Sequence, residues 1–502
     1  MNLTYSFRNF ILSSMVALFP LAGFAEGNNV RDVQSLLLLL GYNPGPVDGA
    51  YGSKTVRALS KFYKDRGSKY DGILDDNEVT LLKREIASEY KKTGEHQEVN
   101  TFGGRLQIPS GLDYQLNDAT LEHFFKINQR SITNESQKLK IAPSKSPFQF
   151  KSRLLDSAAA RNELATSAIL SYLYYEDGYV LYDMLPPEER FSVKIDDESY
   201  FPSHSIGKSL VSYMIGHAIC DGYIASIDDP VKDWPLIEGT LYHEQPLIAL
   251  LNMTAGDTNV IAPLSGSFIK TGRSIHGDGP LIKATKNPRE LANTKSDGIH
   301  KFAYSNLTAD VLMNYLMHRV GQDFESFVEK IFQDKVGISN PIYLWMNPIR
   351  GSQSNLMSKR IKQGAGQYAI DATRYDYLRI ARAILLDWNN DTCVGSYLKS
   401  IYERRLIVPR SRDNPVDRWD GSMRRWGDPQ FGTLTHGYAG QFWVELEGFR
   451  QRKILIMIGA DGQNIAIDTD KSRIIVINSG QEGFGDFQKL AYEPLRYGKI
   501  RE

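Results

Sequence analysis

Ser205 and Lys208 lie three residues apart in the segment FPSHSIGKSL, residues 201–210. Apolar residues at helical spacing follow, so the pair is predicted to stand at the start of a helix. Residues i and i+3 share one helix face, which lets the Lys208 amine reach the Ser205 hydroxyl. A serine becomes a nucleophile when a neighbour takes its proton, and burial can lower the pKa of a lysine enough for that. The spacing therefore predicts a nucleophile and its general base; a solvated lysine on a capped helix is the plain alternative.

Tyr304 and Asn306 form a second group, in the segment FAYSNL at residues 302–307. They are two apart, so an extended or turn segment would place both on one side, ahead of a helical pattern from Thr308 to Val320. The Tyr304 phenol can share a proton network with Lys208 and protonate a leaving group. The Asn306 amide can orient a substrate carbonyl or Lys208 itself.

Two histidines and an acidic segment receive other interpretations. His204 precedes the nucleophile and has no acidic partner in the sequence pattern, so packing is favoured over catalysis. His436 begins a strand-like segment and can line a pocket. In the segment DATRYD, residues 371–376, Asp376 follows Thr373 by three positions, which is typical of a helix cap.

The elements that must position these residues begin with a hairpin. Residues 169–175 and 179–182 are aromatic and β-branched, and they flank Glu176, Asp177 and Gly178. An Asp-Gly turn between two such runs predicts a β-hairpin. At 502 residues, the chain exceeds the usual size of one hydrophobic core, so we expect two or three domains.

Charge and cysteine content limit the partners. Lys plus Arg and Asp plus Glu both number 59, so no long-range field would draw the chain to nucleic acid or to an anionic membrane. Cys220 and Cys393 match no metal-ligand spacing, and we expect neither a metal site nor a cofactor. Whether these two cysteines form a disulfide or stay as buried thiols is left open.

The first 26 residues have the form of a signal peptide. Arg8 precedes an apolar stretch that ends at Gly23, Phe24 and Ala25. Cleavage is expected after Ala25, giving a signal peptide at residues 1–25 and an exported, periplasmic or wall-associated protein with no membrane contact afterwards. A membrane anchor is the alternative, but the run is short and interrupted.

A small helical module is predicted from residue 26 to residue 90. Its first helix should run from Val30 to Leu40, and Ser53 or Thr55 should cap a second helix. The loop GYNPGPVDGAYG, residues 41–52, resembles the repeat of peptidoglycan-binding domains of bacterial wall-lytic enzymes. That resemblance implies a three-helix module that binds peptidoglycan; a helical spacer without binding is the alternative. Residues 91–145 are predicted to be a linker.

The order of motifs beyond the linker is distinctive. The S-x-x-K pair is followed by IDDPV at residues 227–231, LLNMTAG at 250–256 and the Y-x-N of Tyr304 and Asn306. This order resembles the serine β-lactamase and penicillin-binding superfamily, in its class C and esterase-like branch, over residues 165–480. The resemblance implies an α/β (α+β) domain over residues 146–500, in which helices and a helical subdomain flank an antiparallel sheet.

Within that branch, HGYAGQFW at 436–443 and IGADGQ at 458–463 are most similar to 6-aminohexanoate-dimer hydrolases. The resemblance implies that the backbone N–H groups of Ser205 and Ala460 form the oxyanion hole. Penicillin-recognising members carry Lys-Thr-Gly or His-Thr-Gly where this chain has Ala460, Asp461 and Gly462. We expect Asp461 and Gly462 to contact substrate and Asp461 to repel a carboxylate, which favours an amine-bearing or neutral amide or ester.

Three functions remain open from the sequence. The first is an exported serine hydrolase that cleaves a small amide or ester through an acyl-enzyme on Ser205. The second is a peptidoglycan peptidase or amidase, or a β-lactamase-type enzyme. The third is a wall-binding scaffold without catalysis, against which the intact Ser205, Lys208, Tyr304 and Asn306 argue.

Overall fold

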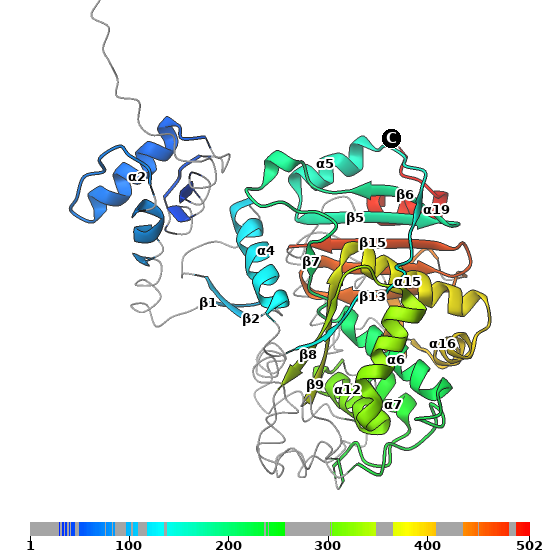
Figure 1. Cartoon of the computed structure of the whole chain (residues 1–502). Helices are drawn as coiled ribbons and strands as arrows, with labels where there is room; N and C mark the ends of the chain where they lie inside the picture. The colour runs from blue at the N-terminus through cyan, green and yellow to red at the C-terminus, as the bar shows by residue number, and fades with distance from the viewer. Residues whose placement is uncertain are drawn as a thin grey trace, which may run out of the picture. The chain divides into compact units, whose positions relative to one another are not determined.

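The computed structural model divides the chain into two compact units, Met1–Gly94 and Glu95–Glu502 (Figure 1). The described residues are 51–75, 77–82, 84–85, 97–101, 104–108, 118–134, 138–234, 237–238, 240–256, 302, 304–347, 365–407, 435–449, 451–480 and 488–501, with some positions between 30 and 50. The predicted signal peptide, residues 1–25, lies outside them. Among the described residues, no helix combines the length and apolar character needed to span a bilayer.

The first unit is built around helix α2, Ser53–Asp65. Its Leu59 and Phe62 are fully buried in a small apolar cluster. The prediction that Ser53 or Thr55 caps this helix is wrong, because the N-cap position is Gly52 and no side chain caps the helix. Thr55 instead faces inward, where it accepts a hydrogen bond of 3.1 Å from Gln34 Nε2.

The second unit contains a nine-stranded sheet whose neighbouring strands are antiparallel, except for the parallel pair β4–β6. This confirms the predicted α/β fold with an antiparallel sheet. In spatial order, the strands are β10 (Leu406–Ile407), β11 (Thr435–Ala439), β12 (Phe442–Leu446), β13 (Ile454–Gly459), β14 (Gln463–Asp468), β15 (Arg473–Ser479), β5 (Ile169–Glu176), β6 (Tyr179–Met184) and β4 (Lys151–Ser152).

The predicted hairpin is present as β5 and β6. Asp177 and Gly178 occupy the turn with φ values of 47° and 95°. Two positive φ angles in a two-residue loop match the right-handed twist of the strands, and glycine and aspartate tolerate that conformation. The sequence signal therefore gave both the strands and the turn correctly.

A second, four-stranded sheet has the order β3 (Lys138–Ile141), β8 (Ile342–Asn347), β9 (Ala365–Thr373) and β7 (Tyr200–Phe201). Helices α6 (Ile206–Cys220) and α12 (Asn306–Val320) pack against β9 and against each other (Figure 1). Further α-helices of the unit are α5 (Ala158–Thr166), α7 (Leu247–Leu251), α13 (Phe324–Glu329), α15 (Arg374–Asn389), α16 (Cys393–Glu403) and α19 (Glu493–Tyr497). Strand β9 thus joins the sheet to the helices that carry the motifs.

The prediction that residues 91–145 form a linker is wrong for much of that range. Strands β1 (Gln97–Thr101) and β2 (Gly104–Ile108) form a hairpin, and α4 spans Asp118–Thr133. Leu121 and Phe125 of α4 and Ile141 of β3 lie in the core of the second unit. These apolar residues are sparse among charged neighbours, so the segment looks like a linker in sequence although one face of α4 is buried.

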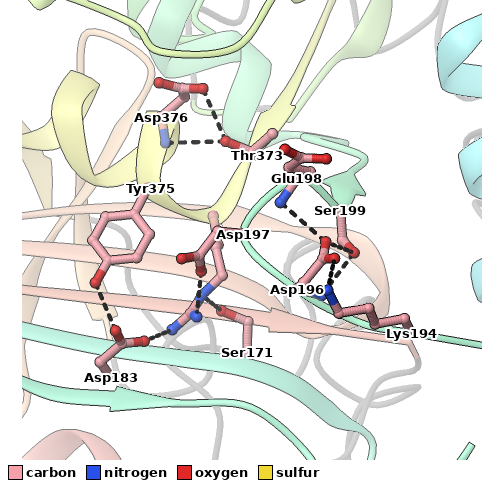
Figure 2. Close-up of polar contacts among 11 residues, drawn as sticks. Ser171, Asp183, Lys194, Asp196, Asp197, Glu198, Ser199, Thr373, Tyr375 and Asp376 are labelled. Carbon is pink, nitrogen blue, oxygen red and sulfur yellow. Dashed lines mark hydrogen bonds and ion pairs between the residues drawn. The ribbon is translucent and has the colours of Figure 1, made fainter. Parts of the chain in front are cut away.

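Helix α15 begins as predicted, because Thr373 is its N-cap and accepts a hydrogen bond from the Asp376 N–H. The next residue, Arg374, is only 1% exposed. Its guanidinium donates to Ser171 Oγ at 2.9 Å and Asp197 Oδ1 at 2.8 Å, and it also pairs with Asp183 (Figure 2). This buried cation therefore ties α15 to β5, β6 and the loop before β7.

Candidate active site

The predicted nucleophile and base are in contact. Ser205 is the N-cap residue of α6, and Lys208 lies on its first turn. Lys208 Nζ donates a hydrogen bond of 2.7 Å to Ser205 Oγ. The two residues are 8% and 1% exposed, so the plain alternative of a solvated lysine is wrong.

The surroundings of Lys208 disfavour its charge. Its amine lies 3.8 Å from the ring centroid of Tyr368 and 4.8 Å from that of Tyr304. Burial holds the pKa of Lys208 well below its usual value, while the field of Asp310 acts in the opposite direction. Aromatic faces attract a cation weakly, but they replace the water that would hydrate it. A neutral amine beside a hydroxyl can accept that hydroxyl's proton.

Two phenols reach the Ser205 hydroxyl. Burial raises the pKa of Tyr304 and of Tyr368, and a hydrogen bond with Ser205 lowers each of them in part. Both phenols are therefore neutral O–H groups at physiological pH and can donate. Tyr304 is predicted from its motif, whereas Tyr368 lies in strand β9 in a segment without a motif and was not predicted.

Asn306 occupies a different local structure from the one predicted. It is the first residue of α12, whose N-cap Ser305 accepts a hydrogen bond of 3.0 Å from the Thr308 N–H. The expected extended or turn segment therefore ends at Ser305. Asn306 starts the helix that also carries Asp310, a buried carboxylate that the sequence analysis did not single out. A lone acid inside an otherwise apolar helical pattern was the signal that could have found it.

The turn before the nucleophile is held by strand β9. Asp371 accepts the Ser203 N–H at 3.0 Å, and Ser203 Oγ accepts the Ile370 N–H at 2.9 Å. A Cβ on Gly207 would lie 2.1 Å from the Tyr368 carbonyl oxygen, so only glycine permits this approach of α6 to β9. Asp371 thus has a role beyond the helix cap predicted for its segment, because it fixes the backbone that presents Ser205.

The end of β13 lies against the same turn. A Cβ on Gly459 would approach the Ser203 carbonyl oxygen to 2.5 Å, so the backbones are in close contact there. The next residues, Ala460–Gly462, form a short 3-10 helix, labelled η7. Ala460, the expected oxyanion donor, therefore follows directly on a strand that touches the nucleophile turn.

His204 and Asp461 form a pair that the sequence analysis did not foresee. His204 Nε2 lies 3.2 Å from Asp461 Oδ2, and the histidine side chain is fully buried. Both residues have positive φ angles, 47° and 58°. The sequence pattern identified no acidic partner for His204, and the structure places Asp461 beside it. Asp461 was expected to point toward substrate, but its carboxylate faces His204.

The remaining motifs form a polar scaffold behind α6. Ser209 Oγ donates to the Gln441 carbonyl oxygen at 2.6 Å. Gln441 Nε2 donates to the Leu251 carbonyl oxygen at 2.8 Å, and the Gly440 N–H donates to Asn252 Oδ1 at 2.7 Å. The segments LLNMTAG and HGYAGQFW are thereby joined to the helix that carries Ser205.

Aromatic residues of the large sheet support Tyr304. Its ring stacks on Trp443 at a centroid distance of 5.7 Å, and Tyr438 packs edge-on at 6.1 Å. His436, which was expected to line the pocket, lies on β11 with Nε2 at 3.4 Å from Glu447 Oε2. The phenol that reaches Ser205 is thus held by strands β11 and β12.

The two cysteines form a disulfide between Cys220, at the end of α6, and Cys393, at the start of α16. This answers the question that the sequence left open. In the part of the chain that the structure describes, no group of three or more His, Cys, Asp or Glu side chains is placed to hold a metal ion.

Comparison with known proteins gives a family for the first unit and similar structures for the second. Residues 26–82 match the family model described as "Putative peptidoglycan binding domain". No curated protein matches the chain.

Several solved structures are similar to the chain. One is titled "Putative 6-aminohexanoate-dimer hydrolase from Bacillus anthracis", with 13% identity, a TM-score of 0.47, and coverage of 74% of this chain and 91% of that one. A penicillin binding protein from Bacillus halodurans has 14% identity, a TM-score of 0.42 and coverage of 65% and 97%. A class C beta lactamase from Rhodobacter sphaeroides has 15% identity, a TM-score of 0.38 and coverage of 64% and 91%. The family match thus covers residues 26–82, and the similar structures have TM-scores below 0.5.

Proposed function

We propose that the second unit is a serine hydrolase that cleaves an amide or ester bond through an acyl-enzyme on Ser205, with Lys208 as general base. The observation that carries this proposal is the 2.7 Å hydrogen bond between the buried Lys208 amine and the Ser205 hydroxyl. Burial lowers the pKa of Lys208, which favours the neutral amine that a general base requires. This combination of contact and burial is what nucleophilic catalysis by serine requires.

In the proposed reaction, the Ser205 O–H bond breaks and its proton moves to Lys208 Nζ. Ser205 Oγ attacks the substrate carbonyl, and the electron pair moves to the carbonyl oxygen, which the N–H groups of Ser205 and Ala460 stabilise. Tyr304 protonates the leaving amine or alcohol and is reprotonated from Lys208, while Asn306 orients the carbonyl. Water then attacks the acyl-enzyme, which releases the acid and restores the Ser205 hydroxyl.

The substrate proposed is a small neutral or amine-bearing amide or ester. Ala460, Asp461 and Gly462 supply no cation for a substrate carboxylate. Asp461 lies 3.2 Å from His204, so part of its carboxylate is turned toward the histidine. Asp461 and Gly462 remain the proposed contacts at this edge of the site.

The proposed setting is outside the cytoplasm, with the signal peptide of residues 1–25 removed and the first unit bound to peptidoglycan. The family match of residues 26–82 and the Cys220–Cys393 disulfide support this setting. The module raises the local concentration of the enzyme near the wall, whichever bond is cleaved. Proposed domain limits are residues 26–90 for the module and residues 118–500 for the hydrolase.

The first test is labelling of Ser205 by a fluorophosphonate, with Ser205→Ala as the matched control. The expected result is labelling of the wild type and none of the variant. A folded wild-type protein that stays unlabelled would contradict the proposal and favour the non-catalytic scaffold. Hydrolysis of a p-nitrophenyl ester, a linear amino-acid-amide oligomer, nitrocefin and muropeptides then compares substrate classes. Serine-dependent turnover of the ester or amide, with nitrocefin untouched, is expected.

A second candidate function is a peptidoglycan peptidase or amidase. The observation that favours it is the match of residues 26–82 to a peptidoglycan-binding family. Serine-dependent cleavage of muropeptides in the same panel would replace the small-amide substrate with a wall substrate. Sacculus pull-down with wild type and Ser205→Ala measures wall binding separately from cleavage, since the variant keeps the first unit unchanged.

A further inference from the structure

Helix α12 carries a buried acidic residue, Asp310, whose charge acts on Lys208. Asp310 is on α12, one helical turn after Asn306, and is 4% exposed. Its Oδ1 accepts the Tyr368 N–H at 3.2 Å. Burial raises the pKa of Asp310 to about 7, and the two influences that lower it in part are this hydrogen bond and the charge of Lys208. The reaction proposed above gives Asp310 no role, although an isolated buried carboxylate is costly.

Tyr368 connects Asp310 to the reacting atoms. Its N–H binds Asp310, its ring lies 3.8 Å from Lys208 Nζ, and its phenol reaches the Ser205 hydroxyl. One turn further along α12, Asn314 accepts the Gly366 N–H at 2.9 Å and donates to the Gly366 carbonyl oxygen at 2.7 Å. Helix α12 therefore binds the β9 backbone through two side chains, one ionisable and one neutral.

We infer that Asp310 is a positioning residue for the base, whose carboxylate stabilises the ammonium formed when Lys208 takes the Ser205 proton. This inference rests on the proposed function. Above its pKa of about 7, Asp310 is ionised, and before the step the unprotonated Lys208 supplies no charge opposite to it. After the step, Lys208 is a cation and Asp310 is its counter-charge, so the proton transfer lowers the cost of the buried carboxylate.

The groups in contact with Lys208 come from three places, because Ser205 lies on its own turn, Tyr304 precedes α12 and Tyr368 lies on β9. The charge of Asp310, on α12, also acts on Lys208. Beyond the nucleophile turn is the pair of His204 with Asp461 on η7. Asp310 is the residue among them whose charge acts on Lys208, so removing that charge should change how Lys208 titrates.

The test measures the rate of fluorophosphonate labelling of Ser205 between pH 5 and pH 10, for wild type and Asp310→Asn. In the labelling step, the Ser205 proton passes to Lys208, Oγ bonds to phosphorus and fluoride leaves. Asparagine keeps an oxygen that can accept the Tyr368 N–H, so only the charge is lost. We expect the limiting rate to fall about 10- to 100-fold, and the acid limb to move to lower pH, because Lys208 loses the carboxylate that favours its protonated form.

Asn314→Ala is the matched control, since it removes the neutral link between α12 and β9. It should lower the melting temperature and leave the acid limb in place. An Asp310→Asn profile with the wild-type acid limb would overturn the inference, and so would an equal shift in Asn314→Ala. If Asp310→Asn does not fold, Asp310→Ser removes the same charge and is measured in its place. Failure of the proposed function is distinguishable, because the wild type itself would then not be labelled.

Discussion

Lys208 and Arg374 are two equally buried cationic side chains in the same unit, each 1% exposed, with opposite surroundings. Arg374 donates to a serine and is paired with two carboxylates, Asp183 and Asp197 (Figure 2). Lys208 donates to Ser205 and otherwise faces the rings of Tyr304 and Tyr368. The arginine and its carboxylate partners hold elements together, whereas burial lowers the pKa of the lysine and favours its proposed role as a base.

The difference shows how a fold separates stability from chemistry. Arginine keeps its proton in proteins, and its planar head satisfies several acceptors, so it suits a structural centre. Lysine shifts its pKa readily when water is removed, so it suits a site that must move a proton. Burial alone does not distinguish the two roles; the neighbouring charges do. Substitutions near Lys208 should therefore affect activity, and substitutions near Arg374 should affect stability.

Replacing Lys208 with methionine should have the largest effect, and it should fall on activity. Loss of the general base is expected to lower kcat/KM for a p-nitrophenyl ester by about 10²- to 10⁴-fold. The pKa of Lys208 is lowered in the folded state, so the wild type loses stability as the pH falls below the value for an unfolded lysine. The free energy of unfolding of the variant at pH 7, measured with urea, should therefore equal or exceed that of wild type. A Lys208→Met variant that is destabilised but active would contradict the division of roles between Lys208 and Arg374.

Replacing Arg374 with methionine should do the reverse. Asp183 and Asp197 would lose their partner, at an expected cost of about 2–4 kcal/mol in the free energy of unfolding. The lower part of the range allows for the carboxylates, whose side chains are 26% and 59% exposed. Urea denaturation gives the change, and labelling of Ser205 in the remaining folded protein should match wild type. Asp197→Asn is the milder control, since its carboxylate is largely solvated.

Replacing Asp310 with asparagine should change the stability of the protein in a way that depends on pH. Its pKa is raised to about 7 in the folded protein, against an ordinary value near 4. The folded state thus holds a proton that the unfolded state has lost, and stability falls as the pH rises through this window. Asp310→Asn should avoid that loss and gain up to about 2–4 kcal/mol over wild type between pH 4 and pH 8. A gap that stays constant with pH in urea titrations would contradict the assignment.

Thr373→Ala should have the smallest effect. The substitution removes the N-cap of α15 next to Arg374 and is expected to cost about 1 kcal/mol in the free energy of unfolding. Activity per folded molecule should not change, because the cap lies in the structural region. Thr373→Ser retains a hydroxyl and serves as the control in the same thermal melts. A loss of activity in Thr373→Ala without a loss of stability would mean that the two regions are coupled.

The sequence predicted the parts whose signals are local. The β5–β6 hairpin followed from Asp177 and Gly178, the start of α15 from Thr373 and Asp376, and the contact of Ser205 with Lys208 from a spacing of three on a helix. The predicted linker was wrong where the apolar residues are sparse. Helix α4 is recognised as part of the unit only once Leu121 and Phe125 meet the core.

Which residues gather around that local pair was decided by tertiary structure. Tyr368 lies 160 positions after Lys208, and Asp310 lies 102 positions after it, yet both act on its amine. The pairing of His204 with Asp461 and the disulfide of Cys220 with Cys393 likewise join distant segments. A pKa depends on the water and charge within a few ångströms, and the folded chain sets those neighbours. The sequence by itself therefore determined the contact of Ser205 with Lys208, and only the packing of α12 and β9 against α6 decided that Lys208 is buried and that the charge of Asp310 acts on it.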